Sequence, residues 1–141
     1  MARLDDGFST LITFGSNSSA TIHFFEKTVT PPGIDGGGEI DTTTMHNTTW
    51  RTRSPKKLKT LAGGETEVAY DTAILTAILA QIQVNQQITV HFPDGHTYTF
   101  WGFLDSFIPA ALKEGEQPTA TIKIIPTNHD NSQVEQAPVY A

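Results

Sequence analysis

Paired carboxylates come nearest to catalytic chemistry in this 141-residue chain. Acid–base hydrolysis uses two carboxyl groups, and the one that acts as the acid needs an apolar pocket to raise its pKa. Acidic residues stand next to each other or two apart in four places: Asp5/Asp6, Glu39/Asp41, Glu65/Glu67 and Glu114/Glu116. No apolar pocket is evident around these pairs, so a solvated acidic face is the better interpretation.

Metal, phosphate and nucleophile chemistry are equally weakly supported. The five histidines occur in neither HxH nor HxxxH spacing, and the chain has no cysteine that could serve as a thiolate ligand or nucleophile. The glycines Gly36, Gly37 and Gly38 lack the following helix and the Lys-Ser/Thr pair of a phosphate-binding loop. We therefore expect a protein that is not an enzyme and has no catalytic residues, no metal site and no cofactor.

The composition also limits the kinds of partner and location that this protein can have. The mass is 15.4 kDa, the net charge is −6 and the isoelectric point is near 5.2, which gives no basic surface for tight nucleic-acid binding. The N-terminus lacks an apolar signal segment, and no later run is long enough to span a bilayer. We expect one soluble domain, residues 1–141, made in the cytoplasm.

Alternation of apolar and polar residues predicts an all-β fold. We expect residues 8–14 and 20–29 to pair as a hairpin, and further strands at 65–70 and 119–125. One helix is predicted from Thr72 to Gln83, capped by Asp71 or Thr72. Its apolar stripe should pack on the core; the stripe consists of Ile74, Leu75, Ile78, Leu79 and Ile82.

The clearest local signal is a hairpin over residues 88–103, centred on Asp94-Gly95, a dipeptide suited to the positive φ of a tight turn. In its second arm Tyr98, Phe100 and Gly102 should share one face, and Trp101 and Phe103 the other. Large aromatic residues on both faces suggest that at least one of Phe100, Trp101 and Phe103 is buried between subunits or beneath the loop of a neighbour. The alternative is that all three lie in the core of the single subunit.

Two segments have little to bury. Residues 29–53, with two prolines and a run of glycines, form a long arm or loop, and loops of this length are usually functional or disordered. The C-terminal tail, residues 128–141, is expected to be mobile unless a partner holds it.

Several motifs follow one another in a recognisable order. They cover nearly the whole chain: Gly36–Thr43, Trp50–Thr52, Pro55–Leu58, Val68–Asp71 before the helix, Phe92–Gly95, Phe100–Leu104 and Pro118–Ile124. In this order and spacing the chain resembles the tail tube proteins of long-tailed bacteriophages, the major tail proteins of the virion.

The resemblance implies a fold, an assembly and partners. The fold would be a β-sandwich or barrel-like antiparallel sheet with one flanking helix, and subunits would form hexameric rings stacked into a hollow tail tube. Such a protein is made in the host bacterial cytoplasm and resides in the virion tail. DNA would pass through the lumen without specific binding, and the tape-measure, tail terminator and tip proteins would be partners. Tubes of contractile tails and type VI secretion systems share this fold and remain an alternative.

On this interpretation the arm makes assembly contacts. The candidate contacts between rings or subunits are Pro31, Pro32, Gly36, Gly37, Gly38, Thr42, Thr43, Trp50, Arg51 and Trp101. A channel for DNA should repel phosphate weakly, so the candidate lumen residues are Glu39, Asp41, Glu65 and Glu67. An acidic outer surface that aids solubility is the alternative for these four.

A carbohydrate-binding or adhesin-like β-sandwich is the rival from another class. In that protein Trp50, Trp101 and Tyr98 would form a stacking platform for sugars. A lectin would stay monomeric and bind glycans, whereas a tube protein would form rings or filaments.

Overall fold

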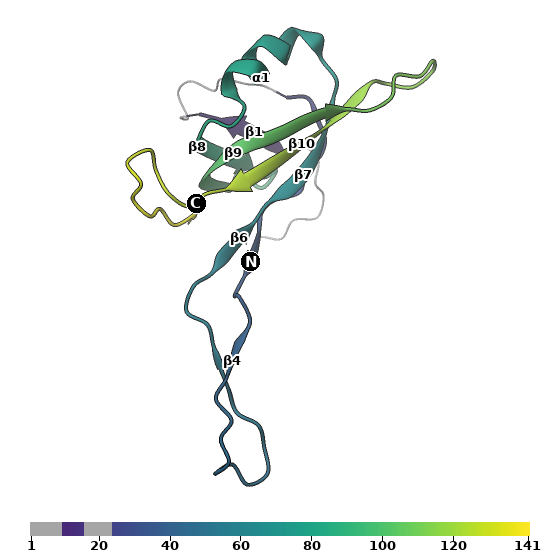
Figure 1. Cartoon of the computed structure of the whole chain (residues 1–141). Coiled ribbons are helices and arrows are strands. Elements are labelled where there is room, and N and C mark those ends of the chain that lie inside the picture. Colours follow the sequence, from purple (N-terminus) through teal and green to yellow (C-terminus); the bar gives the residue numbers. More distant parts are fainter. Residues whose placement is uncertain (1–9, 16–23) are drawn as a thin grey trace.

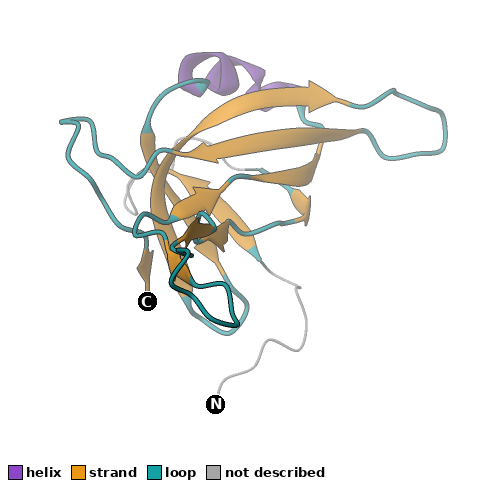
Figure 2. Cartoon of the chain, turned by 60° about the horizontal axis from the view of Figure 1, so that its bottom comes forward, coloured by secondary structure: helices purple, strands orange, loops and turns teal. Residues whose placement is uncertain are grey.

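The computed structural model describes residues 10–15 and 24–141, and its body is an antiparallel sheet that curls into a nearly closed barrel (Figure 1; Figure 2). The strand order is β1-β8-β9-β10-β7-β2, with β11 paired to β9. The strands are β1 Leu11–Phe14, β2 Glu26–Thr28, β7 Gly64–Ala69, β8 Gln86–His91, β9 Thr97–Pro109, β10 Thr119–Pro126 and β11 Val139–Tyr140. The predicted all-β, barrel-like class with one flanking helix is confirmed.

The barrel closes between its first and last strands through side chains. The backbone N–H of Ile12 on β1 donates to Glu26 Oε1 on β2 at 3.1 Å, and the rings of Phe14 and Phe24 meet edge to face at 5.7 Å between centroids.

The predicted hairpin of residues 8–14 with 20–29 is wrong for the described residues, because β1 pairs with β8 and β2 with β7. The expected turn lies largely in residues 16–23, outside the described part. Both pairings join segments far apart in sequence, which local turn chemistry does not reveal.

Apolar side chains at every second position of the central strands fill the barrel. In the β8–β9 hairpin Ile88 lies opposite Phe100 and Val90 opposite Tyr98, and the turn between them contains Gly95 at φ 90°. Phe100 and Leu104 on β9 are buried. On β10, in the region of the predicted strand 119–125, every second residue is also buried, namely Ala120, Ile122 and Ile124. A fully buried side chain of Ile or Phe size contributes about 1.5–3 kcal/mol, so this alternation accounts for most of the drive to fold.

The predicted helix is present as a short 3₁₀ turn, η1 Thr72–Ile74, that continues into α1 Leu75–Gln81. Asp71 caps it, since its Oδ1 accepts the backbone N–H of Ala73 at 2.9 Å. The expectation that the whole apolar stripe packs on the core is wrong: Ile78 is 4% exposed but Leu79 is 79% exposed. A helix of two turns covers only one end of the barrel, and part of its apolar face stays uncovered.

The C-terminal end of α1 is fastened to an irregular point of β9. Gln83, at φ 62°, donates its backbone N–H to the carbonyl oxygen of Leu104 at 3.0 Å. Its side-chain Nε2 donates to Asp105 Oδ1 at 2.9 Å. The register of β9 against β10 shifts here, between Lys123 and Ile124, so Asp105 is the extra residue of a β-bulge. These bonds fix where the helix lies on the barrel.

The arm is a long two-part hairpin that extends from the barrel (Figure 1). Near the barrel β3 Gly33–Asp35 pairs with β6 Thr60–Ala62, and farther out β4 Glu39–Asp41 pairs with β5 Arg53–Pro55. The predicted arm, residues 29–53, comprises the outgoing side and the tip. Residues 54–62 are the returning side.

The C-terminal segment folds back on the barrel. Val139 pairs with Thr99 and Tyr140 with Tyr98, and the ring of Tyr140 stacks on His96 at 5.3 Å between centroids. Its mobility in solution stays a prediction. In the described part of the chain, no helix has the length and apolar character needed to cross a membrane.

Candidate assembly interface

The tip of the arm, residues 42–52, is held by short polar side chains. The backbone N–H of Thr42 donates to the carbonyl oxygen of Thr52 at 3.0 Å. Asn47 donates its side-chain amide to the carbonyl oxygen of Trp50 at 2.8 Å and accepts the backbone N–H of Thr44 at 3.1 Å. The loop therefore has a defined shape without an apolar core of its own.

Large apolar side chains project from this arm into solvent. At the tip, Trp50 is 81% exposed and Met45 is fully exposed; Leu58, Ile34 and Ile40 are exposed along the two sides. Exposed apolar groups gathered on one element mark interaction sites more often than isolated ones do. The arm has the composition of a binding element.

Two acidic candidates for the lumen lie on this arm and face arginines. Glu39 Oε2 is 3.3 Å from Arg53 Nε, and Asp41 Oδ2 is 3.9 Å from Arg51. Hydrogen bonds from the side chain and backbone of Thr43 lower the pKa of Asp41. Exposed ion pairs of this kind contribute little stability, and each carboxylate is partly neutralised by its partner.

The other two lumen candidates lie on the barrel. Glu65 and Glu67 on β7 are exposed and alternate with buried Thr66 and Val68, so they project from the outer face of the sheet. Glu65 is opposite Lys123 on β10. The structure thus places the two acidic pairs on different elements and does not bring them together within one subunit.

The contact candidates divide in the same way. Nine of them lie at the root of the arm, between its two ladders or at its tip: Pro31, Pro32, Gly36, Gly37, Gly38, Thr42, Thr43, Trp50 and Arg51. Trp101 lies apart from these, half-buried on β9. Any contact that uses all ten must therefore involve two surfaces.

Charge is distributed unevenly between arm and body. Residues 33–62 contain five of the nine Lys and Arg residues but only three of the fifteen Asp and Glu residues, which gives this segment a net charge of +2 and the rest of the chain −8. An arm and a body of opposite sign attract each other when they belong to different copies.

An apolar groove lies between α1 and the barrel. It has a volume of about 320 Å³ and is lined by Tyr70, Leu75, Ile78, Leu79, Ile82, Phe107 and Pro109. Sequence reasoning missed this groove because the apolar stripe was interpreted as wholly buried. The signal that could have revealed it is the width of the stripe, which a short helix at one end of a barrel cannot cover.

The aromatic platform of a sugar-binding protein is not formed. Trp50 is at the tip of the arm, whereas Tyr98 lies on β9 with its ring 6.1 Å from that of Phe100. Burial raises the pKa of the Tyr98 hydroxyl. Because side chains alternate along a strand, Tyr98 and Phe100 share one face of β9 and Trp101 projects from the opposite face. Within residues 10–15 and 24–141, no three His, Asp or Glu side chains are grouped to hold a metal ion.

Comparisons with known proteins show the fold. No protein family matches the sequence, and no curated protein does. A chain in the cryo-EM structure of the anti-feeding prophage baseplate, determined with six-fold symmetry, superposes with a TM-score of 0.67 over 100% of this chain and 97% of that one, at 8% sequence identity. The two proteins share a fold over nearly their entire length, although few of their residues are identical.

Proposed function

We propose that this chain is a structural subunit of a phage tail, which forms hexameric rings that stack into a tail tube. The observation that carries this proposal is the full-length fold likeness to a chain of a prophage baseplate solved with six-fold symmetry. Because the match leaves neither chain with a large unmatched part, it supports the same kind of single-domain building block.

The arm supports the assembly part of the proposal. A hairpin that extends from the body with Trp50 and Met45 exposed is costly for a protein that works alone, because it presents apolar area to water. In a stack it would contact a neighbouring subunit, and burial of that area would offset the loss of freedom on association.

The remaining parts of the proposal follow from the resemblance to tail tube proteins. DNA would pass through the tube into the host without specific binding, and the tape-measure, terminator and tip proteins would bind at its ends. Glu65 and Glu67 project from the outer face of the barrel sheet, and we propose that this face lines the channel. The finished protein would reside in the virion after synthesis in the bacterial host.

A second candidate is a baseplate subunit, since the matched chain belongs to a baseplate. Such a subunit would form one ring at the end of a tube and would not extend into long filaments by itself. Tubes of contractile tails and secretion systems belong to the first candidate, from which polymerisation alone does not separate them.

Negative-stain electron microscopy of the purified full chain tests the proposal. We expect rings with six-fold symmetry and stacks of rings at high protein concentration. Single rings that never stack would favour the baseplate subunit. A monomer at every concentration, without rings or filaments, would refute both candidates.

The proposed channel lining has its own test. Tubes of the Glu65→Lys, Glu67→Lys variant should form normally, but virions that carry it should release DNA slowly, most of all at low salt, because a basic lining would bind phosphates at many places. Unchanged release at every ionic strength would show that these side chains do not face the passage.

A further inference from the structure

The groove between α1 and β9 is an apolar site that the rest of the described subunit leaves uncovered. Leu79 is 79% exposed at its edge, while Ile78 beneath it is buried in the core. Just after the helix, Gln83 bonds to Asp105 and Leu104 on β9, while the groove between helix and strand stays open to solvent. A partner seated in the groove would exclude water from its apolar lining.

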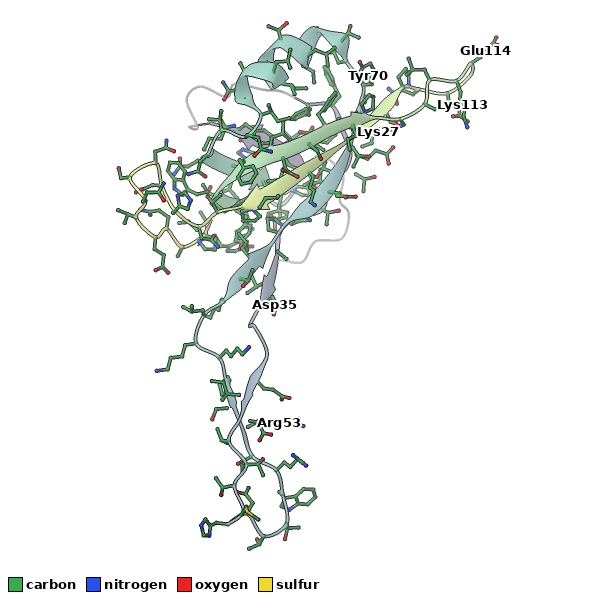
Figure 3. All side chains as sticks on the ribbon, viewed as in Figure 1. Lys27, Asp35, Arg53, Tyr70, Lys113 and Glu114 are labelled. Atoms are coloured by element: carbon green, nitrogen blue, oxygen red, sulfur yellow. The ribbon has the colours of Figure 1, made fainter. Side chains whose placement is uncertain are left out.

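The tip of the arm has matching chemistry and lies at the other end of the molecule. Figure 3 shows Tyr70 beside the helix and Arg53 far along the arm in the opposite direction. The tip therefore cannot fold back onto the groove of its own chain. Any contact between these two apolar surfaces must join two copies.

We propose that the arm tip of one copy docks in the α1–β9 groove of a second copy, with Trp50 inserted beside Leu79 and Phe107. This inference rests on the proposed function and deepens it, because it names the surface that receives the arm. The indole of Trp50 is the largest exposed group at the tip, and a groove of about 320 Å³ lies at the small end of the range of roughly 300–1,000 Å³ for binding pockets. It suits one aromatic anchor.

Charge favours the same pairing. Arg51 in the tip lies 3.9 Å from Asp41, and Arg53 beside the tip lies 3.3 Å from Glu39. Both ion pairs are exposed and contribute little stability, so either arginine can leave its carboxylate for one on a second copy at little cost in free energy. On the receiving side, Asp71 directly follows the lining residue Tyr70, and Asp105 is bonded to Gln83, which follows the lining residue Ile82. Basic residues beside the anchor would meet acidic residues beside the groove.

The contact joins two different surfaces and is therefore heterologous. Each docked copy still presents a free tip and a free groove, so association can continue to further copies. Interfaces of this class generate closed rings or open-ended stacks, which is the behaviour that the proposed function requires.

Paired helix variants test the groove without touching the arm. Leu79→Asp places a charge in the groove, whereas Ala80→Asp places the same charge on the exposed side of the same helix. We expect Leu79→Asp to raise the protein concentration needed for assembly by at least about tenfold and Ala80→Asp by no more than about twofold, as for residues inside and outside an anchor site. Equal effects of the two variants would overturn the inference.

Disulfide cross-linking tests directly whether the arm tip of one copy lies against the groove of another. The chain has no cysteine, so a variant with Thr49→Cys beside Trp50 and Thr76→Cys on α1 should give a ladder of cross-linked multimers when tubes are oxidised. The matched control combines Thr49→Cys with Ala137→Cys, an exposed position in the C-terminal segment, and should give none.

The outcomes separate the two proposals. Tubes that form but give no ladder, or the same ladder in both variants, would overturn the docking inference and leave the proposed function intact. Absence of rings and tubes from the unmodified protein, seen by microscopy, would overturn the proposed function and this inference with it.

Discussion

Replacement of Trp50 by alanine should separate assembly from folding. Trp50 is 81% exposed in the single subunit, so Trp50→Ala should change the free energy of unfolding by no more than about 0.5 kcal/mol, as at other surface sites. If the indole is buried on assembly, it removes about 150–250 Å² from water. At about 25 cal/mol per Å², this is a gross contribution of about 4–6 kcal/mol.

Only part of that contribution survives the cost of ordering and desolvation. Aromatic anchors at interfaces usually cost at least about 2 kcal/mol on truncation, which corresponds to a rise of about 30-fold in the concentration required for assembly. Light scattering against protein concentration measures this threshold, and thermal unfolding by circular dichroism measures the stability of the subunit.

Trp101→Ala is the matched control. Trp101 is half-buried on β9, so its loss should reduce the free energy of unfolding by part of the roughly 3–5 kcal/mol that truncation of a fully buried aromatic residue costs. The melting temperature should therefore fall. A Trp50→Ala protein that assembles at the concentration of the unmodified chain would refute the reasoning about the arm. If Trp101→Ala instead left the melting temperature unchanged and blocked assembly, Trp101 would be the interface residue.

Three further predictions concern the body. Ile122→Ala should destabilise the subunit by about 2–5 kcal/mol in denaturant titrations, because Ile122 is fully buried on a central strand. Gly63→Ala should destabilise it by about 1–3 kcal/mol, since a Cβ there would lie 2.5 Å from the carbonyl oxygen of Ile124. Hydrogen bonds, chiefly from the backbone N–H of Val134, lower the pKa of Asp130 in the folded state. That stabilisation is present above the unfolded-state pKa of about 3.9 and is lost as pH falls through the folded-state pKa. The protection of the Val134 amide, its exchange rate relative to the intrinsic rate at the same pH, should therefore decrease in acid, whereas in Asp130→Asn it should change less with pH.

Local patterns predicted local structure well. The turn at Asp94-Gly95 could be predicted because this dipeptide suits a positive φ. The strand that contains Ala120, Ile122 and Ile124 could be predicted because strand faces repeat every second residue. Asp71 was one of two predicted caps, with Thr72, and it caps the helix because its side chain accepts a free N–H at the first turn.

Long-range arrangement was not readable in the same way. The pairing of β1 with β8 joins segments more than 70 positions apart, and no residue near Phe14 encodes the distant Ile88 that lies opposite it. The exposure of Leu79 depends on where the short helix lies against the barrel, and contacts such as that of Gln83 with Asp105 join residues far apart in sequence. The groove, and hence half of the proposed interface, could be seen only once these distant contacts were known.

Gly37 and Gly38 stand between the two short ladders of the arm, at φ 81° and 90°, where residues with a Cβ are disfavoured. We expect them to act as a joint between the two ladders. In a tube built from such arms, the subunits on the outer side of a curve separate while those on the inner side approach, and each joint can absorb the difference without release of its tip. Resistance to bending would then be set by a few backbone torsions, and a filament with alanines at these positions should follow straighter paths on a microscope grid.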